Sequence, residues 1–222
     1  MPKPTFFNLP EEKRRLILDL AIEEFAERDY KSASISNIVA RAGIAKGSLY
    51  QYFEDKRDLY LYLIQLAAEE KKTFLAQHPP PDPRMSLFDF LRWLMREGTR
   101  FELSNPRLAQ VAYRALFSDR PFGDEPFSRL REVALEYYDG LVQLGIAQGV
   151  IDPQIDRGLA VFLFSAVFNE FGRYLLEREQ IDLQTLARGE ISYQDLPNAG
   201  LVDQLIEILQ RGLAPQAKVS SQ

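Results

Sequence analysis

Residues 34–59 constrain the fold of this chain more than any other stretch, because they place short helical patterns on both sides of a glycine turn within 26 residues. Ser34 or Ser36 is positioned to cap a helix that carries Ile38 on its apolar side. Gly43 supplies the left-handed backbone conformation that often ends such a helix. Two short helices joined by a tight glycine turn predict a helix-turn-helix arrangement.

The helices that follow the turn are predicted from the same apolar spacing. Gly47 and Ser48 open a short helix that runs through Phe53. Asp55 is placed to cap a longer helix that extends toward Gln77.

Another helix is predicted upstream, with Asn8 as its cap and Glu11 at capping-box spacing. Its apolar stripe consists of Leu16, Ile17, Leu20, Ala21 and Phe25, and the glutamates expected away from that stripe are Glu23, Glu24 and Glu27. We therefore expect an N-terminal three-helix domain over residues 8–55 and a connecting helix over residues 56–77.

A Pro-rich turn at residues 78–83 interrupts the helical pattern. Beyond it, helical patterns are found at 86–103, 106–118, 124–148, 156–179 and 198–213, and residues 180–197 are expected to form a loop with a short helix. Strand-like alternation is lacking. The predicted fold is all-α, with a larger helical bundle over residues 84–214 and a disordered tail at 215–222.

The reactive residue types limit the chemistry available to this chain. It contains no cysteine, so disulfides and thiolate metal sites are excluded. Its one histidine, His78, lies beside prolines in the predicted turn, which argues against a Ser-His-Asp triad. A di-iron bundle needs Glu-x-x-His pairs, and none is present. We therefore expect no metal, no cofactor and no catalytic residue, and a protein that is not an enzyme.

Membrane and secretion signals are not recognised in the sequence. No apolar run reaches the roughly 20 residues needed to span a bilayer. The N-terminal segment MPKPTFFNLPEEKRR has no apolar core before its charges. We expect a cytoplasmic protein without a membrane partner.

Charge is unevenly distributed along the chain. The net charge is −5 overall, yet residues 31–57 carry five basic residues against two acidic ones, a net of +3. Residues 58–222 carry 17 Lys and Arg against 23 Asp and Glu, a net of −6. A positive segment on an acidic chain is expected to face an anionic partner.

The positive segment contains the residue types that a DNA-reading helix needs. The N-terminal part of such a helix reaches base edges in the major groove. Ala45 and Gly47 are small enough for close approach of the backbone. Lys46 can donate to guanine, and Gln51 can pair with adenine. The side chains expected on the phosphates are Ser34, Ser36, Ser48, Tyr50, Tyr52 and Lys56. The expected partner is therefore double-stranded DNA.

A second interpretation of the same segment stays open. Leu49 and Phe53 are expected on the inner face, against Ile38 and Val39. Tyr50, Tyr52 and Phe53 also fit as ordinary core aromatics of an all-α protein. In that case the short helices would be part of an ordinary helical core and would not bind DNA.

Residues 12–63 closely resemble the DNA-binding region of the tetracycline-repressor (TetR) family of bacterial regulators. The segments that carry the resemblance are ILDLAIEEFAERDY, SISNIVARAGIAKGSLYQYF and DKRDLYLYL. By this resemblance the DNA-contact positions are Ser36, Lys46, Gly47, Ser48, Tyr50, Tyr52 and Lys56. The chain departs from the family pattern at Val39, where alanine is usual, and at Ile35, where threonine is frequent.

The resemblance implies that residues 84–214 form an effector-binding and dimerisation domain. The helix predicted at 156–179 is apolar on nearly all sides between residues 159 and 168, as expected for a core or an interface. With the helix at 198–213, it is the expected four-helix interface of a homodimer. The alternative is that both helices fill the core of the monomer.

An effector pocket needs apolar walls and a few polar groups. The candidate walls are Trp93, Phe101, Tyr113, Phe117, Tyr137, Tyr138, Phe168 and Phe171, and the candidate polar anchors are Arg100, Asn169 and Arg173. Aromatic residues at helical spacing also occur in plain cores. A small, largely apolar effector, such as a fatty-acyl or aromatic compound, fits these walls.

The function predicted from the sequence is a ligand-responsive, homodimeric repressor that an effector releases from a palindromic operator. Two other classes compete with it. An all-α enzyme would have to use carboxylates such as Glu102, Glu136 and Glu170. A helical adaptor would bind only protein and would have no affinity for DNA.

Overall fold

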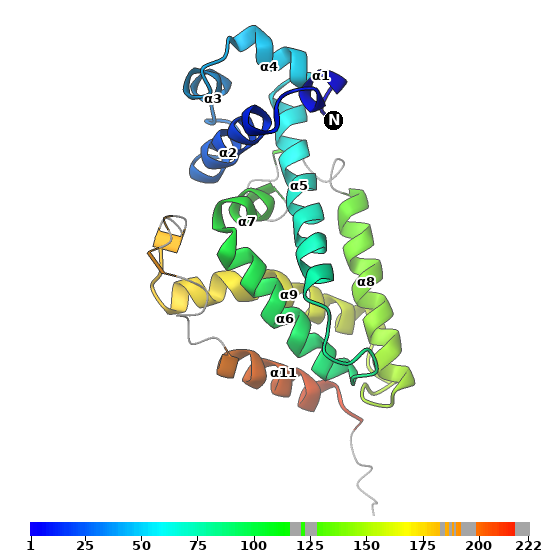
Figure 1. The fold of residues 1–222 in the computed structure, drawn as a ribbon. Helices are drawn as coiled ribbons and strands as arrows, with labels where there is room; N and C mark the ends of the chain where they lie inside the picture. The colour runs from blue at the N-terminus through cyan, green and yellow to red at the C-terminus, as the bar shows by residue number, and fades with distance from the viewer. Residues whose placement is uncertain are drawn as a thin grey trace, which may run out of the picture. The chain divides into compact units, whose positions relative to one another are not determined.

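A computed structural model describes residues 1–115, 121–122, 128–182, 185–186, 188, 190–191 and 199–215 (Figure 1). Every regular element within these residues is a helix, so the all-α prediction is confirmed. The helices are α1 (Pro4–Phe7), α2 (Glu11–Glu27), α3 (Ile35–Arg41), α4 (Lys46–Tyr52), α5 (Lys56–Gln77), α6 (Leu87–Ser104), α7 (Pro106–Tyr113), α8 (Ser128–Ala147), α9 (Arg157–Arg178) and α11 (Ala199–Leu213).

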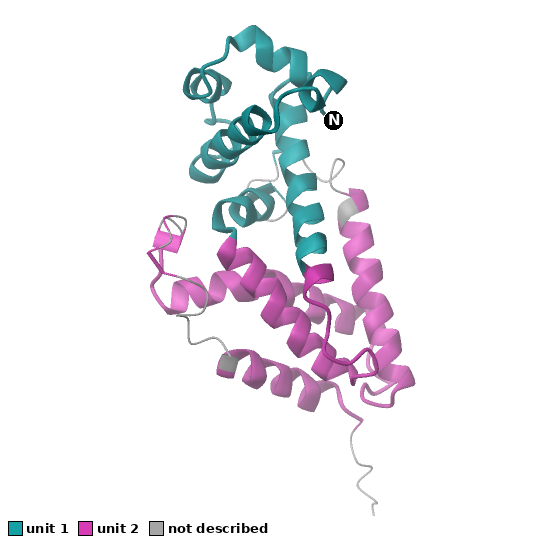
Figure 2. Cartoon of the chain, viewed as in Figure 1, with its two compact units in different colours: residues 1–74, 105–127 teal, residues 75–104, 128–222 magenta. Residues whose placement is uncertain are grey.

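The chain forms two compact units (Figure 2). Unit 1 consists of residues 1–74 and 105–127, and unit 2 of residues 75–104 and 128–222. Unit 1 therefore includes α7, which packs against α2, although the sequence prediction assigns that segment to the C-terminal domain. The domain boundaries given above stay a prediction.

Unit 1 is held together by apolar residues at helical spacing. Helix α2 packs against α3, α3 against α4, and α1 against α4. Its fully buried large side chains are Phe6, Ile17, Phe25, Ile38, Leu49, Phe53, Leu59, Tyr60 and Leu63. Burying a side chain of this size stabilises a fold by about 1.5–3 kcal/mol. The seven-residue helices α3 and α4 are too short to be stable alone, so this packing orders them.

Unit 2 is a bundle in which α8 and α6 both pack against α9, and α11 packs against α6. Its core includes Leu87, Leu91, Val142, Phe164, Leu175, Val202 and Ile206. Helices α8 and α6 approach closely at Gly145, where an added Cβ would lie 2.6 Å from Cδ1 of Ile151 and closer still to a methyl group of Leu87.

The helix ends agree with the sequence in most places. Ser34 caps α3, Gly43 has φ +64°, and the side chain of Asp55 accepts the amide of Asp58 at 2.7 Å in the first turn of α5. Helix α5 ends at Gln77, as expected. The predicted cap at Asn8 is wrong, because Asn8 ends α1 and Pro10 precedes α2.

The apolar stripe of α2 also differs from the prediction at two positions. Leu16 is 45% exposed and does not join the core, whereas Glu24, expected off the stripe, is only 3% exposed. Helix α1 has no counterpart in the sequence prediction. The predicted loop at 180–197 and tail at 215–222 lie mostly outside the described residues.

Helix α9 is long and apolar enough to cross a membrane by its length and mean hydropathy of 1.4. The predicted absence of an uninterrupted apolar run of about 20 residues still holds for α9, because Asn169, Glu170 and Arg173 interrupt its apolar sequence. One third of the apolar window is buried inside the chain, and Phe164, Phe171 and Leu175 of α9 belong to the core of unit 2. Core helices of ordinary globular proteins meet the same criterion, so this is weak evidence for a membrane span.

Candidate nucleic-acid interface

The turn between α3 and α4 is built from local hydrogen bonds. The Ser34 hydroxyl accepts the amide of Asn37 at 3.3 Å, which caps the start of α3. After Gly43, the amide of Ile44 donates to the carbonyl of Val39 at 3.1 Å and closes the end of the helix. The turn is therefore specified by one capping serine and one left-handed glycine.

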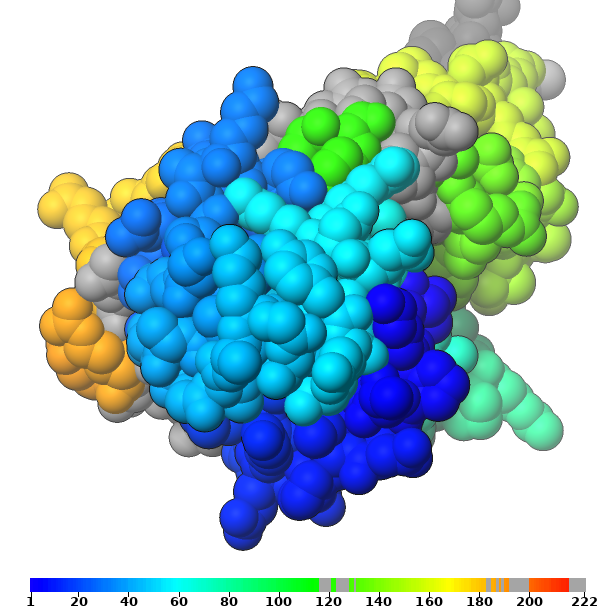
Figure 3. Space-filling view, turned by 90° about the horizontal axis from the view of Figure 1, so that it is seen from above, coloured from blue at the N-terminus to red at the C-terminus, as the bar shows by residue number. Residues whose placement is uncertain are grey.

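Helix α4 has a buried face and an exposed face. Leu49 is 1% exposed and Phe53 is 0% exposed, so both lie in the core with Ile38 and Val39, as predicted. The opposite face exposes Ala45, Lys46, Gly47, Tyr50 and Gln51, and Ser48 is half-buried. Seen from above in Figure 3, residues of α3 and α4 (light blue to cyan) form a continuous surface, with the N-terminal residues (dark blue) beside them. Most of the candidate base and phosphate contacts therefore share one exposed helix face.

Tyr52 lies on the inner side of α4. It is 8% exposed, and its ring centroid is 6.1 Å from that of Phe6. It therefore helps to join α1 to α4, and its predicted contact with a phosphate stays a prediction.

Lys56 is held by the backbone of the α2–α3 turn. Its Nζ donates to the carbonyl of Ala33 and to that of Lys31, the latter at 3.2 Å. The same ammonium lies 4.8 Å from the ring centroid of Tyr30. Loss of water lowers the pKa of Lys56, against the opposing effect of the nearby carboxylates of Asp29 and Glu24. These bonds fix the entry to α3, and a phosphate contact by Lys56 stays a prediction.

Glu24 is a buried residue whose positioning role the sequence interpretation missed. Its carboxylate accepts the amide of Ser34 at 2.8 Å and the side-chain amide of Asn37. Arg28 lies 3.5 Å from the same carboxylate. The buried charge therefore holds the first turn of α3 in place. Its spacing gives no sign of this, because the partners lie 10 and 13 residues away.

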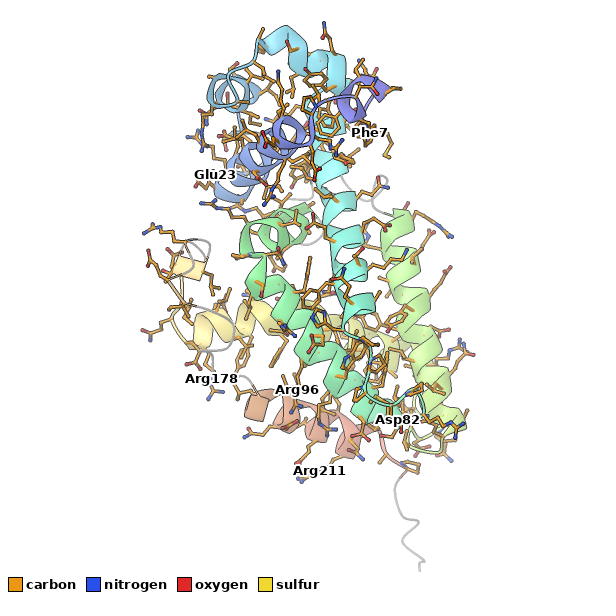
Figure 4. The ribbon with its side chains drawn as sticks, viewed as in Figure 1. Phe7, Glu23, Asp82, Arg96, Arg178 and Arg211 are labelled. Carbon is orange, nitrogen blue, oxygen red and sulfur yellow. The ribbon has the colours of Figure 1, made fainter. Side chains whose placement is uncertain are left out.

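Glu23 of α2, labelled in Figure 4, accepts a hydrogen bond from the guanidinium group of Arg41. Its Oε2 lies 3.0 Å from a guanidinium nitrogen of Arg41 at the end of α3 and 3.8 Å from one of Arg107 on α7. Exposed ion pairs of this kind contribute only about 0–1 kcal/mol each. They therefore add little to the stability of unit 1.

The remaining candidates around α3 differ in exposure. Ser36 is exposed, whereas Ser34 is half-buried and already bonded as the cap. The two departures from the family pattern, Ile35 and Val39, are 6% and 5% exposed. Both are core residues of unit 1, so neither side chain is available to a phosphate.

The predicted effector residues fall in different parts of the chain. Tyr113 belongs to unit 1 and the others described belong to unit 2, while Phe117 lies outside the described residues. Tyr138 and Phe168 lie together, with ring centroids 5.8 Å apart, and Tyr137 is 5.9 Å from Tyr138. Burial raises the pKa of Tyr138, as do Tyr137 and Glu102. The other candidate walls are Trp93, Phe101 and Phe171, of which Phe101 and Phe171 are each 5% exposed.

The candidate polar anchors make local contacts. Asn169 donates to the hydroxyl of Ser165 at 3.2 Å, and Arg173 pairs with Glu170 and Glu177 of its own helix. Arg100 lies 3.2 Å from Glu97. Asn169 and Arg173 share the side of α9 that exposes Phe162, opposite the core residues Phe164 and Phe171. These assignments to an effector site stay predictions.

Within the residues that the structure describes, no group of three or more His, Asp or Glu side chains is arranged to hold a metal ion.

Two family comparisons cover most of the chain. Residues 17–63 match the bacterial regulatory proteins of the tetR family, and residues 85–214 match the tetracyclin repressor-like C-terminal domain. The chain belongs to the TetR family. The resemblance found in residues 12–63 is thereby confirmed, and the C-terminal match extends the family assignment to most of the remaining chain.

Solved structures agree with this assignment. A TetR family transcriptional regulator from Chloroflexus aurantiacus J-10-FL is 46% identical, with a TM-score of 0.85 over 97% of this chain and 100% of that one. The transcriptional regulator FadR from Bacillus subtilis, solved in complex with stearoyl-CoA, is 20% identical and has a TM-score of 0.65 over 90% of this chain and 98% of that one. The second likeness shows the fold alone.

A curated relative points the same way. The fatty acid metabolism regulator protein of Bacillus subtilis (strain 168) is 24% identical over 173 residues, which are 77% of this chain and 88% of the relative. TetR family proteins are transcriptional regulators that bind DNA through a helix-turn-helix, and they are not enzymes. This chain is therefore a transcriptional regulator with a DNA-binding helix-turn-helix, and a DNA-reading role for the exposed face of α4 stays a prediction.

Proposed function

We propose that this protein is a homodimeric repressor that a small, largely apolar effector releases from a palindromic operator. The observation that carries the proposal is the two-sided structure of α4, which buries Leu49 while it exposes Lys46, Tyr50 and Gln51. An exposed polar face on a firmly anchored short helix is what major-groove reading requires. This role places the protein in the cytoplasm.

The candidate DNA-binding residues fall into three groups: base contacts, phosphate contacts and positioning residues. Lys46 and Gln51 face base edges, with Ala45 and Gly47 allowing close approach. Ser36, Ser48 and Tyr50 hold phosphates. Ser34, Tyr52 and Lys56 already make contacts within unit 1, which favours a positioning role for these three residues. In that role they hold α4 so that Lys46 and Gln51 stay aligned with the base edges.

The proposed dimer uses exposed apolar residues of α9 and α11. Leu159 and Phe162 on α9 are 53% and 62% exposed, and Ile208 on α11 is 66% exposed. Large apolar side chains gathered on such surfaces commonly mark protein interfaces. A two-fold pair of these helices would bury them and would give each dimer two recognition helices.

The proposed effector is a fatty-acyl compound. FadR from Bacillus subtilis was solved with stearoyl-CoA, and the fatty acid metabolism regulator is a relative of this chain. The aromatic pair Tyr138 and Phe168 offers apolar wall area in unit 2. Effector binding would favour a conformation in which the two α4 helices no longer fit successive major grooves.

A titration tests this proposal. A labelled duplex, obtained by selection from a random pool, is bound by the full chain and titrated with stearoyl-CoA. We expect the bound fraction to fall as stearoyl-CoA rises, while coenzyme A alone has no effect. A duplex that stays bound at saturating stearoyl-CoA would contradict the acyl effector, and tighter binding would contradict the repressor mechanism.

A further inference from the structure

The C-terminal end of α4 has an unusual set of hydrogen-bond partners. The last carbonyls of a helix lack intrahelical donors and need partners from elsewhere. In α4, the Leu49 carbonyl accepts the amide of Phe53 at 2.9 Å. The next three carbonyls, those of Tyr50, Gln51 and Tyr52, all accept donors from residues 3 and 5 of the chain.

Two residues supply these three donors. Lys3 gives its amide to Tyr52 at 2.7 Å and its Nζ to the carbonyl of Tyr50 at 2.9 Å. The hydroxyl of Thr5 donates to the carbonyl of Gln51. Helix α4 has no basic residue in its own last turn, so Lys3 provides the positive charge that favours a helix C-terminus.

Phe6 anchors this segment in the core of unit 1. Its side chain is fully buried, with ring centroids 4.9 Å from Phe53, 6.1 Å from Tyr52 and 6.0 Å from Tyr62. Phe7, labelled in Figure 4 and 51% exposed, lies at the end of the same turn. A four-residue helix is not stable alone, so α1 is ordered because it packs here.

We propose that residues 3–6, the N-terminal brace, fix the position of the recognition helix and thereby set its affinity for a specific DNA sequence. The proposal rests on α4 being the DNA-reading helix. The carbonyls that the brace holds belong to the same residues, Tyr50 and Gln51, that present exposed side chains toward DNA. A shift of this backbone would move both side chains together.

The brace lies outside the part of the chain that matches the family's DNA-binding domain, residues 17–63. Lys3 and Thr5 are positioning residues, because their donor groups bind the carbonyls of α4. Their loss should therefore weaken specific binding more than binding to any duplex, since non-specific binding depends on phosphate charge.

Thr5→Val is the most informative variant, because it removes one hydroxyl from an exposed residue and keeps the side-chain shape. Thr5→Ser retains the hydroxyl and serves as the matched control. We expect Thr5→Val to lower affinity for a selected duplex by about 3- to 10-fold, the loss typical of one hydrogen bond. Thr5→Ser should bind as wild type does.

Two further readouts separate a positioning role from a direct contact with DNA. Affinity for a random-sequence duplex and the salt dependence of binding should be unchanged in Thr5→Val and in Lys3→Met. A salt slope that falls by about one in Lys3→Met would mean that Lys3 holds a phosphate, and would overturn the proposal. Wild-type affinity of Thr5→Val for the selected duplex would also overturn it.

Amide hydrogen exchange of the free protein tests the brace without DNA. The amides of α4 and of Phe53 should exchange faster in Thr5→Val, while those of α3 keep their wild-type rates. Unchanged rates in α4 would overturn the brace. If wild type selected no duplex, the DNA-binding role would be contradicted, but the exchange rates would still show whether the brace orders α4.

Discussion

Glu24 is a charged residue that unit 1 buries, and its carboxylate holds the first turn of α3. Removing it would leave the amide of Ser34 without an acceptor inside the domain. The cost of an unsatisfied donor reaches about 1–3 kcal/mol when it is buried, and the substitution would remove the acceptor of the Asn37 side chain as well. We expect Glu24→Ala to lower the free energy of unfolding by that amount in urea denaturation.

Glu27 provides the matched control, because it lies on the same helix and is exposed. Glu27→Ala should change the free energy of unfolding by less than about 0.5 kcal/mol. Equal losses in the two variants would show that the buried carboxylate has no special role.

Two lysines of unit 1 are predicted to behave differently toward DNA. Lys46 is exposed on α4, so Lys46→Met should weaken operator binding by about 1–3 kcal/mol and relax the preference at one base pair. Lys56 is bonded to two carbonyls, so Lys56→Met should lower stability and leave the salt dependence of binding unchanged.

Binding isotherms at several salt concentrations distinguish these outcomes. Lys72→Met, at a 79% exposed position on α5, is the control for a lost surface charge. A salt slope that falls by about one in Lys56→Met would instead assign Lys56 to a phosphate.

The sequence predicted residues whose roles follow from local rules. Ser34 and Gly43 were identified because caps and left-handed glycines depend on the immediate neighbours. Leu49 and Phe53 were placed on the inner face by helical spacing alone. Glu24 was missed, because its partners come from a different helix.

At the scale of elements, the long helices were predicted well and the short ones depended on context. The predicted ends of α5, α6, α9 and α11 lie within about two residues of the structure, since their apolar patterns are long. Helix α1 spans four residues, too few to show a helical period, and it forms only against α4. Tyr52 is buried against Phe6 of α1, so its burial could not be predicted without that helix.

Two glycines of α8 test how the packing of unit 2 constrains a helix. A Cβ at position 145 would overlap side-chain atoms of Leu87 and Ile151, whereas at position 140 it would meet nothing within 4 Å. We expect Gly145→Ala to destabilise the chain by about 1–3 kcal/mol through overpacking. Gly140→Ala should stabilise it by up to about 1 kcal/mol, because alanine favours helix.

Thermal unfolding of both variants measures the difference. The two substitutions are chemically identical and lie five positions apart on one helix. If Gly145→Ala were as stable as Gly140→Ala, the close approach of α6 to α8 would be contradicted.

At the scale of the whole molecule, a dimer is proposed to bury the exposed apolar side chains of α9 and α11. Phe162 is 62% exposed on α9. Phe162→Glu would place a charge in the interface, and we expect the dimer to dissociate at micromolar concentrations in sedimentation equilibrium.

Val133→Glu is the comparison variant, since Val133 is also exposed, at 47%, but lies on α8. It should leave the dimer intact. A dimer that survives Phe162→Glu, or one that Val133→Glu dissociates, would place the interface elsewhere.

The sequence of unit 2 predicts an apolar bundle. It does not show which face of α9 packs in the core of the monomer and which is free for a dimer interface. A side chain in a monomer core and one in a dimer interface are both apolar, so spacing alone does not separate them. The exposure of Phe162 and the burial of Phe164, two residues along the same helix, distinguish the two faces.

Selection from a random duplex pool is the most direct test of DNA reading by the exposed face of α4. Wild type should enrich an inverted repeat whose half-sites lie about one helical turn, or a multiple of it, apart. Gln51→Ala should lose preference at one base pair in each half-site, by about 1–3 kcal/mol. Enrichment of no sequence by wild type, or of the same sequence with the same preference by Gln51→Ala, would contradict the account.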